Sequence, residues 1–386
     1  MEEIQMEQLQ WAQEVSEKIC HKMRIVAERN KEKIPYTTVD GVFDDKSDDN
    51  TIGWWTNGFW GGMMWQLYNA TKDELYKEIA VSNEKKLDYV LMHNKMLDHD
   101  NGFKWLPTAV ANFRLNGDEE AKNRGILAAD NLAGRFNPVG RFIRAWNDGG
   151  DGVKAGWAII DCMMNLPLLY WAHEVTNDPR YLQIATMHAD TAQKYFIRED
   201  GSSNHIVEFD PVTGEYVRIY RGQGYAEGSS WTRGQAWAIY GFALSYIHTG
   251  NESYLNTAKR VANYFIANTP ESGLIPVDFR QPVDCTLDDS TAAAIAACGM
   301  IEIAKQLEKK GELGVNESHI YLNAAVKMLK ALDEKRSNWD DNCDAIIEKC
   351  TSAFHDAKGH EITIIYGDYY FIEAIWKLTE QEIFIW

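Results

Sequence analysis

The sequence lacks the features that place a protein on nucleic acid or on a membrane. It has 39 Lys and Arg residues against 57 Asp and Glu, a formal net charge of −18, and no block of basic residues. Because binding to nucleic acid or to an anionic bilayer depends on basic clusters, we expect neither as a partner. No run approaches the ~18 consecutive apolar residues that a membrane-spanning helix needs.

Cysteine is sparse, and motifs for metals or cofactors are missing. The six cysteines form no CxxC pair and no short His/Cys spacing, so we expect no metal site and reduced thiols. No P-loop, dinucleotide fingerprint, nucleophile elbow or HExxH motif calls for a cofactor. The first residues, MEEIQMEQLQWAQ, lack the basic and apolar regions of a secretory signal. We therefore expect a cytoplasmic protein.

A recurring helix–turn–helix pattern organises the chain. Each copy has a helix that is apolar nearly all round, a short polar turn, and a second helix with one apolar face. The copies are at 55–90, 110–136, 155–196, 234–265, and 289–308 with 318–334, and the terminal segments 11–30 and 367–378 are expected to form a sixth pair. Such units must stack on neighbours to bury their apolar faces.

The repeats predict one all-α domain over residues 1–386, an (α/α)6 barrel. The alternative, an open solenoid, should carry polar capping repeats at its ends, and none is present. One β-hairpin is expected as an insertion at 201–222, where alternating apolar residues flank the turn 210–214. In such a ring the ends of the inner helices line a central cleft.

GWAIIDCMMNLPLLYWA, residues 156–172, is an apolar run that contains a single carboxylate, Asp161. We expect the run to be an inner helix. An ionised carboxylate among apolar side chains is costly unless it is paired, hydrogen-bonded or neutralised. It could cap a neighbouring helix or pair with an arginine. Alternatively, desolvation raises its pKa and suits it to general acid–base chemistry near neutral pH.

A second carboxylate, Asp100, lies in LDHDNGF, residues 97–103, a loop expected to enter an inner helix. Taken alone, this motif is as consistent with a plain turn that carries an N-cap as with a functional site. Two carboxylates on facing inner elements of a ring are the usual equipment for cleaving glycosidic bonds. Asp100 and Asp161 are therefore our candidate catalytic pair.

Aromatic and cationic residues in glycine-rich segments are candidates for binding a sugar. The chain is rich in Trp, with 14 residues, and Trp146 and Trp231 lie among Gly and polar residues, where an indole suits a sugar ring. Arg221 and Arg233, in the segment 221–235, suggest recognition of a carboxylate or sulfate. The alternative is a surface loop whose arginines extend into solvent.

Six motifs, in this order, resemble those of the unsaturated glucuronyl hydrolases of glycoside hydrolase family 88. They are WWTNGFWGG, DHDNGF, RAWNDGG, the run that contains Asp161, RGQGYAEGSSWTRGQAW and IIYGDYYFIEA. The resemblance implies an (α/α)6 barrel, which the repeats indicate independently. It also implies a substrate: a glycosaminoglycan oligosaccharide whose non-reducing end is the 4,5-unsaturated uronic acid left by a polysaccharide lyase.

The resemblance further implies a mechanism and a set of site residues. The family hydrates the C4=C5 bond, and the resulting hemiketal opens and expels the rest of the sugar chain. Asp161 would be the general acid/base, and Asp100 would hold sugar hydroxyls and tune Asp161. The implied substrate-binding residues are Trp54, Asn57, His99, Trp146, His205, Gln223, Trp231, Arg233 and Trp237. Arg221 matches an arginine used by members that act on sulfated substrates, and Ser352, His355 and Lys358 loosely match its C-terminal partner loop.

Other functions remain open at this point. The related unsaturated rhamnogalacturonyl hydrolases of family 105 share the ring and act on pectin fragments. An inverting hydrolase or an epimerase on the same barrel would act on saturated sugars, and a non-catalytic toroid would bind sugar without turnover. We expect a monomer or a weak homo-oligomer.

Overall fold

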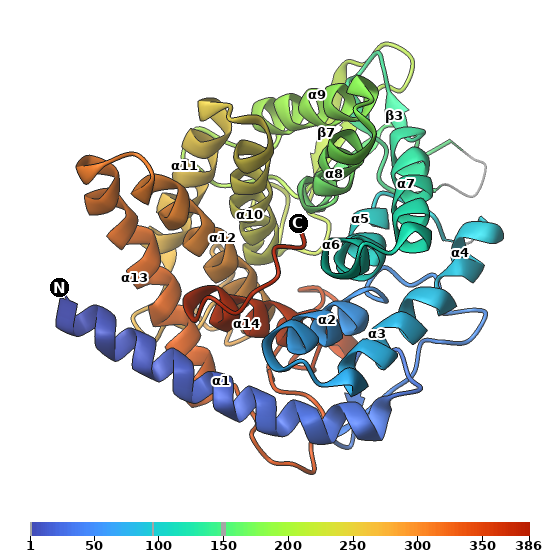
Figure 1. Ribbon diagram of the computed structural model, residues 1–386. Coiled ribbons are helices and arrows are strands. Elements are labelled where there is room, and N and C mark those ends of the chain that lie inside the picture. Colours follow the sequence, from blue (N-terminus) through green and yellow to red (C-terminus); the bar gives the residue numbers. More distant parts are fainter. Residues whose placement is uncertain (1, 95, 148–151) are drawn as a thin grey trace.

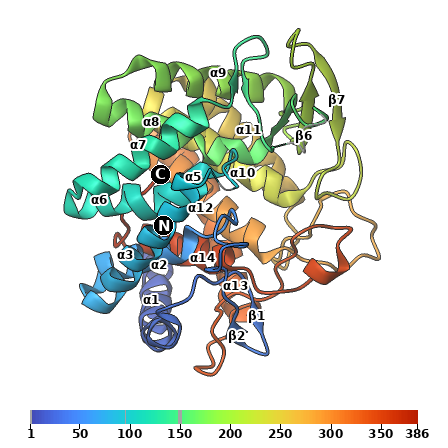
Figure 2. The same ribbon diagram turned by 90° about the vertical axis from the view of Figure 1, so that its right-hand side faces the viewer.

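The structure, a computed structural model, describes residues 2–94, 96–147 and 152–386 and is predominantly helical (Figures 1 and 2). Buried inner helices alternate along the chain with outer helices. The inner elements are α2 (Phe59–Thr71), α5 (Asn101–Trp105) continued by a π-helical turn (Leu106–Val110) and α6 (Ala111–Asn116), α8 (Leu166–Thr176), α10 (Thr232–Thr249), α12 (Ser290–Glu308) and α14 (Ile365–Leu378). The outer helices are α3 (Glu74–Lys86), α7 (Glu119–Ala133), α9 (Pro179–Tyr195), α11 (Glu252–Asn268), α13 (Glu312–Lys335) and α1 (Glu2–Asn30), and a short α4 (Asp88–Met92) follows α3. The predicted (α/α)6 barrel is confirmed.

Four of the helical pairs share one turn chemistry. The inner helix ends on a residue in the left-handed conformation, and the next residue caps the outer helix with its side chain. The left-handed residues are Lys72, Gly117, Asn177 and Gly250, and the capping residues are Asp73, Asp118, Asp178 and Asn251. A left-handed C-cap ends one helix, and an Asp or Asn side chain satisfies the first amides of the next. The polar turns of the repeat are therefore tight reversals between two helices.

The N- and C-terminal helices close the ring. α14 packs against α12 on one side, against α2 on the other, and against α1 on its outer face (Figure 1). The indole of Trp376 in α14 donates a hydrogen bond to the Gln66 carbonyl of α2 (3.2 Å). The prediction of a closed ring, rather than an open solenoid, is thus confirmed.

In the described part of the chain, three small antiparallel sheets lie outside the helical pairs. The expected hairpin forms from β6 (Ile206–Phe209) and β7 (Tyr216–Tyr220), and a third strand, β5 (Trp157–Ile159), joins it on the β6 edge. The other two sheets are β1 (Thr38–Val39) with β2 (Val42–Phe43), and β3 (Phe136–Asn137) with β4 (Phe142–Ile143).

The buried apolar side chains form one main core that includes residues from Val15 in α1 to Trp386. All six cysteines are unpaired. Within the described ranges, no helix is long and apolar enough to cross a membrane.

Candidate active site

Asp161 lies in a short 3-10 turn, Ile160–Met164, between β5 and α8. The expectation of a continuous inner helix over 156–172 is therefore wrong in its first part. The chain enters as a strand because β5 pairs with β6, and the Ile160 amide then donates to the His205 carbonyl (3.1 Å). The helix begins only at Leu166, with Pro167 in its first turn, where proline is well tolerated. The position of Asp161 is therefore fixed by β5 before the turn and by α8 after it.

The side chain of Asp161 is largely buried, with 17% of its surface exposed. Its Oδ1 atom is buried and accepts no hydrogen bond from the described residues. Burial raises the pKa of Asp161 to about 7, although the positive charge of Arg233 acts to lower it. At neutral pH this group can therefore both donate and accept a proton.

His205 faces this carboxylate from the start of β6. Its Nε2 atom lies 3.7 Å from Oδ1 of Asp161, and its ring packs on the indole of Trp231 with the centroids 4.1 Å apart. The backbone amide of Gln223 donates to Nδ1 (2.9 Å), so Nδ1 carries the lone pair and Nε2 the proton. Burial lowers the pKa of His205 to about 3. The imidazole is thus a neutral donor aimed at Asp161.

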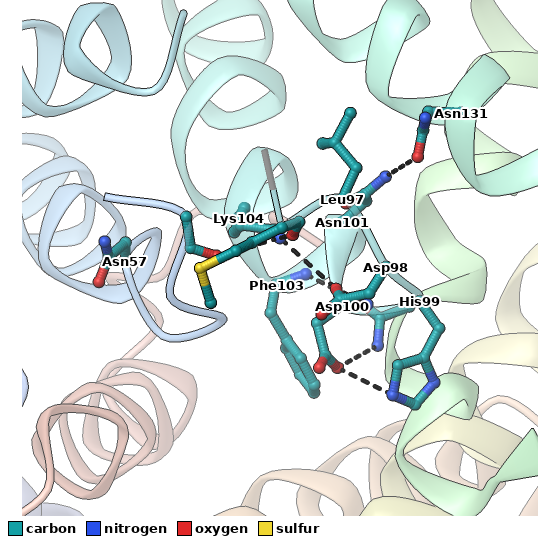
Figure 3. Close-up of polar contacts among 12 residues, drawn as sticks. Asn57, Leu97, Asp98, His99, Asp100, Asn101, Phe103, Lys104 and Asn131 are labelled. Atoms are coloured by element: carbon teal, nitrogen blue, oxygen red, sulfur yellow. Dashed lines mark hydrogen bonds and ion pairs between the residues drawn. The ribbon is translucent and has the colours of Figure 1, made fainter. Parts of the chain in front are cut away.

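Asp100 lies directly before α5 and is buried together with His99 (Figure 3). The His99 Nε2 atom is 3.4 Å from Oδ1 of Asp100, and the Asp100 amide donates to Asp98 Oδ1 (3.0 Å). Burial raises the pKa of Asp100 well above its usual range, and the nearby carboxylates of Asp98 and Asp161 raise it further. Since both carboxyls favour protonation, the pair is expected to titrate as a unit.

Part of the predicted substrate-binding set gathers around one cavity of about 680 Å³ beside His205. Trp146, Arg221 and Gln223 line it with His205, as do Trp157, Tyr220 and Tyr225. Trp146 is partly exposed, and Arg221 is exposed. The rest of the RAWNDGG motif, residues 148–150, lies outside the described residues. A second cavity, of about 790 Å³ around Arg135, contains none of the predicted site residues.

Other predicted residues lie in the walls of the site or away from it. Trp237, which the resemblance implies binds substrate, is fully buried, and its ring packs against Phe103, Tyr366 and Tyr370. Asn57 is also fully buried, and its amide donates to the carbonyls of a neighbouring loop, at 2.8 Å for Ile52.

Trp54 and Trp231 differ in how far they are exposed. Trp54 is partly exposed and meets Tyr36 edge-to-face, with the centroids 5.9 Å apart. Trp231 is only 3% exposed and supports His205 from behind. Trp54 therefore keeps an open surface, whereas the contacts of Trp231 are mainly with the protein.

Arg233 is not a free anion-binding group, as its sequence context had suggested. It is buried, forms an ion pair with Asp289, and donates to the Thr351 (2.8 Å) and Ser352 (2.5 Å) carbonyls. Gln223 also donates to the Ser352 carbonyl (2.7 Å). Arg233 therefore holds the loop around Ser352 against the start of α10, and Gln223 ties the same loop to the one that starts at Arg221.

Two further residues of the loop around Ser352 had been predicted to bind substrate. His355 is exposed, and its Nε2 atom lies 2.8 Å from the Tyr225 carbonyl. Lys358 is exposed beyond it. Both lie on the segment that packs next to the cavity, because the Phe354 amide donates to the Gln223 carbonyl (2.9 Å).

Three residues that the sequence did not single out organise this site. Asp289 neutralises Arg233, and Asp278 accepts bonds from the Ser230 amide (2.8 Å) and the Tyr225 amide (3.0 Å), which shapes the loop over the cavity. The side-chain amide of Asn165 contacts both the Asp100 carboxylate and the backbone carbonyl of Asp161. The only sequence signal was weak: Asn165 precedes a Leu-Pro pair typical of a helix start.

Comparison with known proteins gives one consistent result. The sequence model of Glycosyl Hydrolase Family 88 matches residues 22–380. The chain is 35% identical over 381 residues to an unsaturated chondroitin disaccharide hydrolase of Streptococcus pneumoniae (strain ATCC BAA-255 / R6), covering 96% of this chain and 92% of that protein.

Solved structures agree in both fold and sequence. The crystal structure of unsaturated glucuronyl hydrolase from Bacillus sp. GL1, responsible for degradation of glycosaminoglycan, matches with a TM-score of 0.87 at 36% identity, over 94% of this chain and 96% of that one. An Asp-to-Asn mutant of the Streptococcus agalactiae enzyme, complexed with dGlcA-GalNAc6S, matches with a TM-score of 0.82 at 31% identity, over 97% and 93%. The chain therefore belongs to glycoside hydrolase family 88.

Proposed function

We propose that this protein is an unsaturated glucuronyl hydrolase that acts on lyase-generated glycosaminoglycan oligosaccharides, with Asp161 as general acid/base. The observation that carries the proposal is the largely buried Asp161 carboxyl, whose Oδ1 atom has no hydrogen-bond partner among the described residues and whose pKa is raised to about 7. The names of the similar proteins support the substrate class, since they include an enzyme for unsaturated chondroitin disaccharides and a complex with dGlcA-GalNAc6S.

The proposed reaction begins with transfer of a proton from Asp161 to C4 of the unsaturated uronate. Positive charge then develops on C5 and the ring oxygen, and a water molecule adds to C5 while Asp161 takes a proton from it. The resulting hemiketal opens, and C1 then releases the glycosidic alcohol. One water is consumed, and Asp161 ends the cycle protonated, as it began.

His205 and Asp100 have supporting parts in this proposal. The neutral His205 Nε2–H group faces Asp161 and stabilises the carboxylate that forms after the proton has left. Asp100, whose carboxylate contacts the Asn165 amide, holds a sugar hydroxyl, and the negative charge of Asp161 raises the pKa of Asp100. The exposed Arg221 in the cavity wall is suited to an anionic group on the second sugar.

The direct test supplies the purified protein with an unsaturated chondroitin disaccharide and follows the ultraviolet absorbance of the conjugated double bond. We expect that absorbance to disappear and a free amino sugar to be released. An unsaturated rhamnogalacturonan disaccharide, the family 105 alternative, should react far more slowly. Turnover of a saturated disaccharide would indicate an inverting hydrolase or an epimerase, and binding without loss of absorbance would indicate a non-catalytic protein.

We also propose that residues 1–386 fold as one domain that works in the cytoplasm as a monomer or weak homo-oligomer. The main core shared by α1 through α14 supports a single folding unit, and six unpaired cysteines suit a reducing compartment. A single cooperative thermal transition and light scattering across a dilution series test the domain and the assembly, and fractionation of the source cells tests the location.

A further inference from the structure

One buried side chain, Asn165, joins the two carboxylate-bearing segments of the site. Its Nδ2 atom is 3.4 Å from Oδ1 of Asp100 and 3.3 Å from the backbone carbonyl of Asp161. Its Oδ1 atom accepts from the Phe103 amide at the start of α5 (2.9 Å). Asn165 is 0% exposed, so it contacts these segments and not a sugar in the cavity.

The backbone of α5 is shaped to allow this contact. A Cβ atom at Gly102 would lie 2.5 Å from Cα and 2.6 Å from Oδ1 of Asn165. Any side chain there would push α5 away from Asn165, because heavy atoms do not approach so closely. This close approach explains why the DHDNGF motif has a glycine at position 102. Without a side chain there, the loop that carries Asp100 can pack directly against the turn that carries Asp161.

Asn165 is an uncharged hydrogen-bond donor among several titratable and charged side chains. Asp100 and Asp161 face titratable or charged groups from their own segments and from neighbouring elements, namely Asp98, His99, Lys104, Arg135, Cys162, His205 and Arg233. Among the groups acting on Asp100, burial and the two other carboxylates favour the protonated form, whereas Lys104 and the Asn165 amide favour the ionised form.

We propose that Asn165 is a positioning residue of the reaction: its amide fixes the spacing of Asp100 and Asp161 and, by donating only to the former carboxylate, makes the two groups unequal. This inference rests on the proposed function. An amide is suited to the task because Oδ1 can accept from α5 while Nδ2 donates to the carboxylate. Neither an ionised Asp nor a Leu can do both.

The test compares Asn165→Asp with Asn83→Asp. Asn83 is buried and has the same hydrogen-bond pattern elsewhere in the barrel: its Oδ1 accepts from the Gly61 amide (2.7 Å), and its Nδ2 donates to the Asn57 carbonyl (3.1 Å). Both partners of Asn83 are backbone groups and neither is a carboxylate. Asn83 therefore reproduces the contribution of Asn165 to stability but not its contact with Asp100. Both variants keep an oxygen for the helix amide and lose the donor.

We expect Asn165→Asp to lower kcat about 100-fold and to raise KM by less, because the spacing of the two carboxyls affects the proton transfer more than the hold of Asp100 on one hydroxyl. The added negative charge should move the pH profile of kcat/KM about one unit to higher pH. Asn83→Asp should lower stability and leave the profile in place. If Asn165→Asp does not fold, Asn165→Ala takes its place, with the same direction of shift expected because the donor is lost.

The outcomes separate the two claims. Suppose that the wild type is active and that the Asn165 variant keeps the wild-type pH profile and loses only as much stability as Asn83→Asp. This outcome overturns the role of Asn165 and leaves the proposed function standing. A wild type that does not turn over the unsaturated disaccharide overturns the proposed function, and this inference with it. Carbon-13 titration of the aspartate carboxyls gives a readout without turnover: an unchanged Asp100 signal in the variant also overturns the role of Asn165.

Discussion

The Nε2 atom of His205 lies 3.7 Å from Oδ1 of Asp161, and Gly222 packs against the other side of the same imidazole. A Cβ atom at Gly222 would lie 1.9 Å from Nδ1 of His205. The orientation of His205 therefore depends on a glycine in the next loop as well as on the Gln223 amide that donates to Nδ1.

Gly222→Ala should displace the imidazole and lower kcat/KM about 100-fold, although Ala contains no group that could interfere chemically. The matched control is Gly228→Ala in the same loop. Both glycines have positive φ, +57° and +72°, but a Cβ at Gly228 meets nothing within 4 Å. The control should lose about 1 kcal/mol of stability and keep its activity. Equal activity in the two variants would contradict the role given to His205.

Asp289→Asn should destabilise the protein by about 3–5 kcal/mol, because it leaves the buried guanidinium of Arg233 without its counter-charge. Urea unfolding measures this directly. Asp288→Asn is the control: Asp288 pairs with Arg336 at a partly exposed site, where an ion pair contributes about 1 kcal/mol or less. Similar losses in both variants would show that Arg233 does not depend on Asp289.

Asp161→Asn should make the fold more stable at pH 8. The pKa of Asp161 is raised from 3.8 to about 7, so the folded state binds this proton more tightly than the unfolded state does. That contribution is fully present below pH 4 and is lost as the pH rises through 7. The variant should therefore gain up to about 4 kcal/mol over the wild type at pH 8, and less at pH 5.

Asp368 supplies the contrast for this prediction. Its pKa is also raised to about 7 by burial, but its carboxylate accepts bonds from the Ile346 and Ile347 amides (Oδ1 to Ile347, 2.7 Å). Asp368→Asn places an NH2 group against the Ile346 amide, which offsets part of the gain from removing a carboxyl with a raised pKa. We therefore expect a smaller gain at pH 8 for Asp368→Asn than for Asp161→Asn. Thermal unfolding of both variants at pH 5 and pH 8 checks this difference, and a loss of stability in Asp161→Asn would contradict the unsatisfied state of Asp161.

Trp146→Ala should raise KM about tenfold with little change in Tm, because this partly exposed indole lines the cavity. Trp237→Phe should lower Tm with little change in KM, since Trp237 is buried against Phe103 and other aromatic side chains. Steady-state kinetics and thermal unfolding of the two variants check the pair. If only Trp237→Phe raised KM, the result would indicate that Trp237, and not Trp146, contacts the substrate.

The helical architecture was predictable because its signals are local. The inner and outer helices differ in composition, and the reversals carry residues such as Gly250 and Asn251, whose backbone and capping preferences are intrinsic. The turn at Asp161 was not, because an apolar run suits a buried strand and a buried helix equally well. Only pairing with β6, far along the chain, decides the conformation of Trp157–Ile159.

The site was predictable in its chemistry but not in its connections. A lone carboxylate in an apolar run marked Asp161, the polar loop 97–103 marked Asp100, and motif resemblance added His205. The partners that fix those groups come from distant positions: Asp289 lies 56 residues from Arg233, and Asn165 lies 65 residues from Asp100. An isolated Asn or Asp carries no periodic signal, so their roles became visible only in three dimensions.

The central claim is that Asp161 transfers the proton in hydration of the double bond, and Asp161→Asn tests it most directly. The measurement is the initial rate of absorbance loss with an unsaturated chondroitin disaccharide, at the pH optimum of the wild type, with folding checked by circular dichroism. The account predicts a loss of about 1,000-fold or more in a folded protein. A folded variant that keeps more than a tenth of the wild-type rate would contradict it.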